Sequence, residues 1–220
     1  MPPKKSAHPK PTVIILVRHG KTPTTGQVLP GRARGLHLSE EGLAQAEAVA
    51  DRIVALAEAS TRAPVAVYAS PLERTRETAR PIARKLGLSV QADRGLLECE
   101  FGEWTGAKLA DLAKKPEWTQ VQRSPSGFRF PGGESFLEMQ SRITDAIARL
   151  VARHPGETVV AVSHADPIKA AVAMAAGTPL DLFQRLTVNP CSASVLAYSP
   201  AGPHVLAVNS TGPLSELAIA

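Results

Sequence analysis

The chain has 220 residues, of which 44% are apolar and 20% are charged, and its formal net charge at pH 7 is +5. This length allows one α/β domain with a substantial core. The positive charge favours anionic partners without choosing between nucleic acids and phosphorylated metabolites. Aromatic residues make up only 4% of the chain, which argues against a stacking surface for nucleic acid.

The amino terminus and the cysteines narrow the class of protein further. Residues 1–11 are basic and rich in proline, and they lack the apolar core of a signal peptide. We expect a disordered tail there, followed by one domain over residues 12–220. No apolar run approaches the roughly 20 residues that span a bilayer, so no membrane contact is expected. Cys99 and Cys191 match no metal-binding or redox spacing, which favours a reducing, cytoplasmic location.

Residues 13–17 form the first predicted element, an apolar run that ends in Arg18, His19 and Gly20. Such a run indicates a strand buried on both faces, as in parallel sheets. In open α/β sheets, ligands bind beyond the carboxyl ends of the strands. Arg18 and His19 therefore stand where a ligand would bind, and Gly20 lets the backbone turn close to it.

Apolar periodicity and capping residues predict the next helices and strands. Ser39 is a candidate N-cap for a helix whose apolar positions recur over residues 43–56 at steps of three and four. Residues 65–69 predict a second buried strand. Pro71 fits the first turn of the helix that follows, and Pro81 within that helix predicts a kink or an interruption.

The middle of the chain predicts a long insertion. Residues 88–90 are a short strand candidate, and a mixed acidic and apolar stretch follows at residues 97–104. Residues 105–133 combine prolines and glycines with only a weak helix at 109–112, so we expect a long surface excursion there. Loops of this length are usually functional lids or disordered segments.

The last third of the chain returns to alternating helices and strands. Residues 134–150 predict an amphipathic helix, residues 158–162 a third buried strand that leads to His164, and residues 167–176 a helix of small residues. Two further strand candidates, residues 191–197 and 205–208, are expected to be neighbours at one edge of the sheet. The whole pattern predicts a single three-layer α/β/α sandwich around a mostly parallel sheet, with one long insertion.

Arginines and histidines follow three of the predicted buried strands. Arg18 and His19 follow the first, Arg74 lies one turn into the helix after the second, and His164 follows the third. If the strands share a sheet, these four side chains converge at one edge of it. Guanidinium groups match phosphate oxygens with paired hydrogen bonds. The set therefore predicts a cage for a phosphoryl group.

Five motifs run in order from about residue 12 to residue 170. They are Leu16-Val-Arg-His-Gly-Lys-Thr22, Ser70-Pro-Leu-Glu-Arg74, Leu97-Glu-Cys-Glu-Phe-Gly-Glu-Trp104, Gly132-Gly-Glu-Ser135 and Val162-Ser-His164. Together they resemble the histidine phosphatase superfamily, in its phosphoglycerate mutase-like branch. That group contains cofactor-dependent phosphoglycerate mutases and many small phosphatases.

The resemblance implies a role for each residue of the cage. His19 would be the nucleophile that takes the phosphoryl group, and nearby arginines would keep it neutral. His164 would bind the transferring group, while Arg18 and Arg74 would hold its oxygens. Glu98 would protonate the leaving oxygen and then activate water. No metal or other cofactor is implied, and the sequence shows no metal-ligand spacing.

The resemblance also implies partners and further contacts. The substrate would be a phosphorylated small molecule, and a homodimer through a sheet edge or a helix face is compatible with the family. Loops beside the cage would supply the substrate-binding residues, for which the candidates are Thr22, Thr25, Gly31, Arg32, Arg34 and Ala165.

Departures from the family pattern leave alternatives open. A glycine usually follows the second histidine, whereas Ala165 and Asp166 follow it here, and Asp166 is a rival to Glu98 as proton donor. An acidic residue is common where this chain has Arg34. Thr25 stands where the mutases of this group have an asparagine.

The surroundings of the two carboxyl groups favour Glu98 as the proton donor. Glu98 lies in a segment with Phe101 and Trp104, whose apolar surfaces would desolvate it and raise its pKa. Asp166 heads the helix expected to start near Pro167, where the helix dipole favours the ionised form.

We therefore predict a metal-independent phosphatase that hydrolyses a phosphomonoester through a phosphohistidine on His19. A phosphomutase with the same site is the alternative, but Arg123 in the insertion has no adjacent arginine, unlike the pair found in the mutases. A third hypothesis is an inactive binder of phosphorylated ligands or nucleic acids that uses the basic tail. The complete set of reactive residues argues against it.

Overall fold

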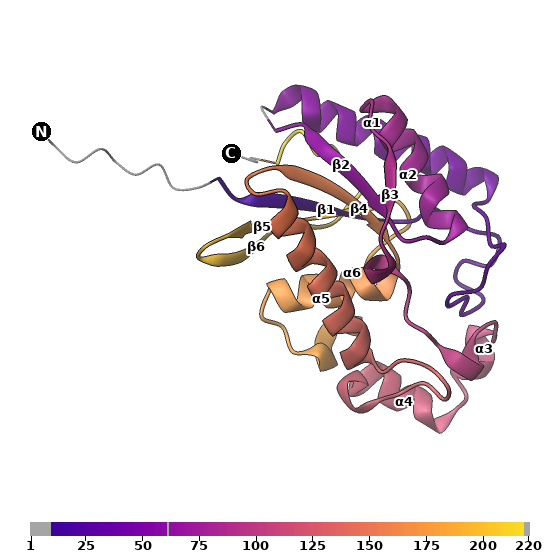
Figure 1. Ribbon diagram of the computed structural model, residues 1–220. Coiled ribbons are helices and arrows are strands. Elements are labelled where there is room, and N and C mark those ends of the chain that lie inside the picture. The colour runs from indigo at the N-terminus through magenta and orange to yellow at the C-terminus, as the bar shows by residue number, and fades with distance from the viewer. Residues whose placement is uncertain (1–9, 61, 218–220) are drawn as a thin grey trace, which may run out of the picture.

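The computed structural model describes residues 10–60 and 62–217 of the chain (Figure 1). Within these residues, six strands form one sheet in the order β3-β2-β4-β1-β5-β6. The first four strands of this order run parallel, and β5 and β6 are antiparallel to their neighbours. The expected tail, residues 1–11, falls almost entirely outside the described residues. The strands are β1 (Thr12–Arg18), β2 (Pro64–Ala69), β3 (Val90–Ala92), β4 (Thr158–Ser163), β5 (Ala193–Ser199) and β6 (Gly202–Ser210).

Helices cover both faces of the sheet, so the predicted three-layer α/β/α arrangement is confirmed (Figure 1). The longer helices α1 and α2 lie on one face, and α5 and α6 lie on the other. Short helices α3 and α4 belong to the insertion. The bounds are α1 (Glu40–Ala59), α2 (Glu73–Lys85), α3 (Leu109–Leu112), α4 (Pro116–Arg123), α5 (Phe136–Arg153) and α6 (Ala165–Ala175).

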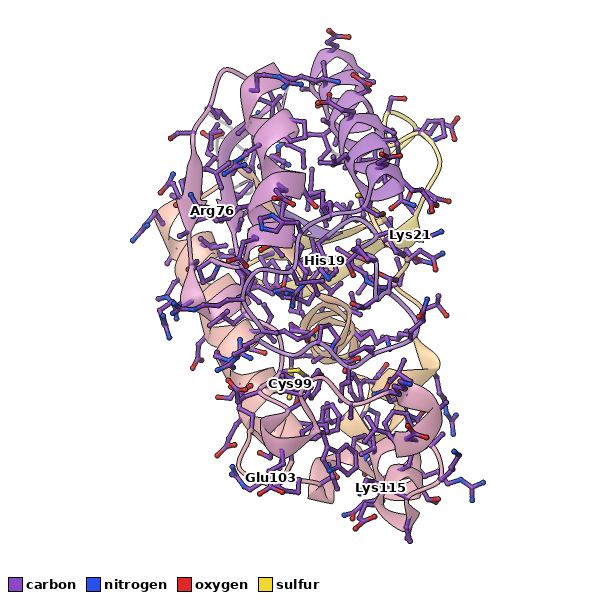
Figure 2. The ribbon with its side chains drawn as sticks, turned by 90° about the vertical axis from the view of Figure 1, so that its right-hand side faces the viewer. His19, Lys21, Arg76, Cys99, Glu103 and Lys115 are labelled. Atoms are coloured by element: carbon purple, nitrogen blue, oxygen red, sulfur yellow. The ribbon has the colours of Figure 1, made fainter. Side chains whose placement is uncertain are left out.

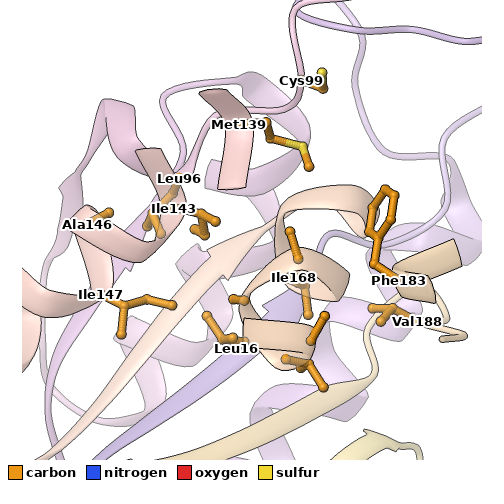
Figure 3. Close-up of a cluster of buried hydrophobic side chains, with 14 of the residues drawn as sticks. Leu16, Leu96, Cys99, Met139, Ile143, Ala146, Ile147, Ile168, Phe183 and Val188 are labelled. Atoms are coloured by element: carbon orange, nitrogen blue, oxygen red, sulfur yellow. The ribbon is translucent and has the colours of Figure 1, made fainter. Parts of the chain in front are cut away.

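Alternate residues of β1 enter two separate apolar cores. Val13 and Ile15 pack with the buried side chains of α1 and α2, whereas Leu16 packs with those of α5 and α6. Figure 3 shows Leu16 in the second core, close to Ile168 of α6. Because both faces of the strand are buried, its apolar run is continuous instead of alternating.

Local capping sets the starts of two long helices. The Oγ of Ser39 accepts a hydrogen bond from the backbone N of Gly42 at 3.1 Å, which confirms the predicted N-cap of α1. Ser135 and Glu138 form a reciprocal capping box at the start of α5. Of the kink or interruption expected at Pro81, the interruption is wrong, because α2 continues through this buried proline to Lys85.

Near the end of the chain, the strands agree with the prediction and the helices differ slightly from it. The neighbouring pair β5 and β6 is confirmed, with β6 at the edge of the sheet. Helix α6 begins at Ala165, so Asp166 lies inside its first turn. A short 3-10 segment, Leu180–Arg185, was not predicted. Among the described residues, no helix combines the length and apolar character needed to cross a membrane.

The insertion, expected as a long surface excursion, is folded onto the domain. Besides α3 and α4 it contains a 3-10 turn at Pro125–Gly127. Its aromatic side chains meet Trp104, whose ring centroid lies 5.5 Å from those of Phe128 and Phe130. Val121 of α4 is buried in the same core. Burial of these apolar side chains orders the insertion despite its prolines and glycines.

Candidate active site

Three parallel strands end side by side at the candidate active site. Strands β2, β4 and β1 are neighbours, and Arg18 at the end of β1 is in register with Ser163 at the end of β4. The imidazoles that follow these two strands lie close together, with 5.2 Å between the ring centroids of His19 and His164. In Figure 2, His19 lies between the layer of α1 and α2 and the segment that carries Cys99.

His19 is buried, and one of its ring nitrogens is already engaged. Its Nδ1 lies 2.7 Å from the carbonyl oxygen of Gly20. Because a carbonyl oxygen only accepts hydrogen bonds, Nδ1 must carry the proton, which leaves a lone pair on Nε2 in the neutral ring. Burial lowers the pKa of His19 well below its ordinary value, and the charges of Arg74 and Arg18 lower it further. His19 is therefore neutral near pH 7.

The turn after His19 requires a glycine because two backbones meet there. A Cβ on Gly20 would lie 2.6 Å from the carbonyl oxygen of Gly42 in α1. The backbone N of Gly20 donates to the Oγ1 of Thr78 in α2 at 3.0 Å. The segment after β1 is thus held against α1 and α2, and this contact orients the imidazole of His19.

His164 is fully buried and held by a serine that the sequence analysis did not assign. Its Nε2 lies 2.9 Å from the Oγ of Ser70, which directly follows β2. Its Nδ1 has no hydrogen-bond partner among the described residues and lies 4.0 Å from Oε2 of Glu98. Burial, followed by the charge of Arg74, lowers the pKa of His164 well below its ordinary value.

Both arginines of the predicted cage have unused donors. Arg18 donates from Nη1 to the carbonyl oxygen of Val188 at 2.6 Å, and Arg74 donates from Nη2 to that of Gly31 at 2.7 Å. The Nε of Arg18 and the Nε and Nη1 of Arg74 are buried and have no hydrogen-bond partner among the described residues. Buried guanidinium donors without partners are costly, so their presence indicates a site for an anion.

Glu98 is the buried carboxyl group of the site. One of its oxygens, Oε1, accepts a hydrogen bond from the backbone N of Cys99 at 2.9 Å. Burial raises the pKa of Glu98 to about 7, and the negative charge of Asp166 contributes to this rise. The cations Arg74 and Arg18 oppose it. The upward direction agrees with the prediction from the neighbouring aromatic residues.

Arg32 binds the backbone of Glu98 and holds the segment that carries it. Its Nε donates to the carbonyl oxygen of Glu98 at 2.8 Å, and its Nη2 bonds Oε2 of Glu134 at 2.8 Å. Arg142 of α5 binds the same carbonyl oxygen and both oxygens of the Glu134 carboxylate. The structure thus places Arg32 in a partly buried ion-pair network, and it does not line the cavity beside His19.

Two other candidate substrate contacts also lie outside that cavity. Gly31 turns its carbonyl oxygen toward Arg74 and has a positive φ of 50°, which glycine tolerates. Arg34 is exposed and lines a different hollow, together with Arg94. Neither residue lines the cavity beside His19, so direct substrate contact by Gly31 and Arg34 stays a prediction.

A cavity of about 260 Å³ opens beside His19. Of the residues proposed from the sequence, Arg18, Thr22, Thr25, Glu98 and Ala165 join His19 in its wall. Thr22 and Thr25 are joined by a hydrogen bond from the backbone N of Thr22 to the Oγ1 of Thr25 at 2.8 Å. The cavity is also lined by residues that no motif marked, among them Val28, Leu29, Leu109, Trp118, Lys169 and Gln184.

Asp166 has a cationic partner in the cavity wall. The Nζ of Lys169, one turn further along α6, lies 3.4 Å from Oδ1 of Asp166 and 3.0 Å from Oε1 of Gln184. Asp166 lies in the first turn of α6, so it is held beside a cation at the amino end of a helix. Across residues 10–60 and 62–217, no group of three or more histidine, cysteine, aspartate or glutamate side chains is arranged to hold a metal ion.

The sheet and its site define an α/β protein with an anion pocket made of two neutral histidines, two guanidinium groups and a buried carboxyl group. The model of the histidine phosphatase superfamily (branch 1) matches residues 14–211. The chain belongs to this superfamily.

Relatives and solved structures match most of this chain, and two of those described here are phosphatases by name. A bifunctional protein of Mycobacterium tuberculosis is 33% identical over 204 residues, which are 92% of this chain and 55% of that protein. Phosphoserine phosphatase 1 of Hydrogenobacter thermophilus is 31% identical, with 92% of this chain and 94% of that protein covered. The native structure of a mycobacterial glucosyl-3-phosphoglycerate phosphatase superposes with a TM-score of 0.80 at 26% identity, covering 92% and 100% of the two chains. The chain spans about half the length of the mycobacterial bifunctional relative.

Proposed function

We propose that this protein is a phosphatase that hydrolyses a phosphomonoester through a phosphohistidine on His19, without a metal ion. The single observation that carries the proposal is the neutral His19, with a free lone pair on Nε2, beside the unpaired guanidinium donors of Arg18 and Arg74. The phosphatase names among the relatives support the same class of reaction.

In the first step, Nε2 of His19 attacks the phosphorus atom, and the bond from phosphorus to the ester oxygen breaks. Glu98 donates its proton to that oxygen, so the organic group leaves as an alcohol. The pKa of about 7 keeps much of Glu98 protonated near neutral pH, as a general acid requires. The free donors of Arg18 and Arg74 bind the phosphoryl oxygens and supply the positive charge of the site.

In the second step, the Glu98 carboxylate takes a proton from a water molecule, whose oxygen attacks the phosphorus atom. The bond from phosphorus to Nε2 then breaks, inorganic phosphate leaves, and both His19 and protonated Glu98 are restored. His164 assists both steps if Ser70 donates to its Nε2, because Nδ1 then carries a proton that can bind a phosphoryl oxygen.

The covalent intermediate can be trapped with an aryl phosphate that carries radioactive phosphorus. We expect a protein-bound label that survives alkaline denaturation and is lost in acid, as a phosphorus–nitrogen bond requires. His19→Ala should abolish the label, whereas His204→Ala should retain it because that histidine is exposed on β6. Labelling that persists in His19→Ala would overturn the assignment. Turnover that disappears after dialysis against a chelator would overturn the metal-independent mechanism.

Hydrolysis is proposed ahead of the mutase alternative because of the charges in the cavity. Among the described residues that line the cavity, Lys169 is the cation besides Arg18 that could bind the carboxylate of a carboxylated phosphate. Its Nζ already lies 3.4 Å from Oδ1 of Asp166. The two functions separate when the trapped phosphoenzyme is offered phosphoglycerate in water. Release of inorganic phosphate is expected to dominate, and efficient transfer to the added metabolite would favour the mutase.

A further inference from the structure

Apolar residues line much of the cavity beside His19, and five of them form what we call the apolar wall. Val28, Leu29 and Pro30 contribute to it from the loop after β1, and Leu109 of α3 and Trp118 of α4 contribute from the insertion. All five are partly buried, so each side chain keeps some surface that a ligand can contact. A substrate group that covered them would remove apolar surface from water.

The aromatic part of this wall is held in place by packing. The ring of Trp118 stacks on that of Trp104, with 6.3 Å between centroids and 29° between planes. Trp104 in turn contacts Phe128 and Phe130. The backbone N of Leu109 donates to the carbonyl oxygen of Gln27 at 2.9 Å, which fastens α3 to the loop after β1. The wall is therefore a formed surface that needs little rearrangement to bind a ligand.

The charges in the cavity disfavour a second anionic group on the substrate. Among the described residues, Arg18 and Lys169 are the cations that line it, and Arg18 belongs to the phosphoryl cage. A carboxylate that approached Lys169 would also approach Asp166, which lies 3.4 Å from the lysine Nζ. The cavity volume of about 260 Å³ is small for a ligand site, so the part of the organic group that the cavity encloses must also be small.

We propose that the substrate is a small phosphomonoester with an uncharged, apolar organic group, such as a short branched alkyl or single-ring ester. The wall of Leu109 and Trp118 binds that group, and Asp166 selects against carboxylated phosphates. This inference rests on the proposed phosphatase activity and deepens it by naming the substrate class. Phosphoserine, the ester in the name of one relative, is accordingly expected to be a poor substrate.

The test compares two esters of the same size and similar leaving group. Isohexyl phosphate ends in two methyl groups, and the phosphate ester of γ-hydroxybutyrate carries a carboxylate in their place. We expect kcat/KM to be at least about tenfold higher for the isohexyl ester, since each buried methylene-sized group contributes about fourfold. A higher kcat/KM for the carboxylated ester would overturn the inference.

A charge placed in the wall should reverse the preference. Leu109→Arg adds a cation beside the bound organic group, so the ratio of carboxylated to isohexyl turnover should rise about tenfold. Ala110→Arg is the matched control, because this neighbouring residue is exposed and does not line the cavity. An unchanged ratio in Leu109→Arg, or an equal rise in Ala110→Arg, would contradict the assignment of the wall.

Removing the aromatic side chain gives a second readout. Trp118→Ala should lower kcat/KM for isohexyl phosphate about tenfold, chiefly through KM, and Trp118→Phe should recover most of it.

If neither ester is hydrolysed by the wild-type protein, and methyl and phenyl phosphates are not hydrolysed either, the proposed phosphatase activity itself fails. If those simple esters are hydrolysed but the carboxylated ester is preferred, only the substrate class fails.

Discussion

At the scale of single residues, the two carboxyl groups of the site differ because their neighbours differ. Glu98 is 7% exposed, and burial and the charge of Asp166 raise its pKa to about 7. Asp166 lies in the first turn of α6, with the Nζ of Lys169 3.4 Å from its Oδ1. The environment thus favours Glu98 as the proton donor of the proposed mechanism, although both carboxyl groups line one cavity.

Glu98→Gln should reduce turnover of alkyl phosphates by about 10²–10⁴-fold, the usual contribution of general acid–base catalysis. Aryl phosphates should lose less in the phosphoryl-transfer step, because their leaving groups barely need a proton. Asp166→Asn should cost much less with both kinds of ester. Single-turnover kinetics on the two ester classes measures this difference. A leaving-group-dependent loss in Asp166→Asn, without one in Glu98→Gln, would reverse the two roles.

Asp166→Asn should nevertheless change the pH dependence. Glu98 must be protonated to act as the acid, so kcat/KM for alkyl phosphates falls as pH rises through its pKa of about 7. The charge of Asp166 raises that pKa, and its removal therefore moves the alkaline limb of the profile to lower pH. Asp111→Asn, at an exposed site in α3, is the control and should leave the limb in place. A limb that moves to higher pH in Asp166→Asn contradicts the electrostatic argument.

At the scale of secondary-structure elements, close contacts between backbones position the reactive groups. The segment after β1 meets the first turn of α1, where a Cβ on Gly42 would lie 2.0 Å from the carbonyl oxygen of Lys21. Ser39 strengthens this contact, because its backbone N donates to the same oxygen at 2.9 Å. The orientation of His19 therefore depends on how closely α1 approaches the end of β1.

Gly20→Ala should destabilise the fold and reduce activity together. The added Cβ would lie 2.6 Å from the carbonyl oxygen of Gly42, so β1 and α1 must move apart. Overpacking of this kind costs about 1–3 kcal/mol of unfolding free energy. Urea unfolding and kcat/KM measure the two effects. Gly212→Ala is the control, because a Cβ there meets nothing within 4 Å. Equal stability of Gly20→Ala and the wild-type protein would contradict the geometry.

At the scale of the whole molecule, the sheet and the insertion have separate tasks. The ends of β1, β2 and β4 bring the histidines together, and α2 supplies Arg74 from above one face of the sheet. The insertion and the loop after β1 form the apolar wall of the cavity. In the proposed function, phosphoryl chemistry and substrate choice are therefore carried by different parts of the chain, so the second could change while the first is retained.

The sequence alone determined the features that follow from local patterns. The continuous apolar runs of β1 and β4 predicted parallel strands. The carboxyl ends of parallel strands lie at the same edge of a sheet, so the convergence of His19 and His164 could be predicted. Only the tertiary structure decided which side chains face the cavity. Arg32 binds Glu134, 102 residues away, and Ser70 binds His164, 94 residues away. No local pattern encodes partners at such separations. The packing of the insertion could not be predicted for the same reason, because its order comes from aromatic contacts with the rest of the domain and not from its own helix propensity.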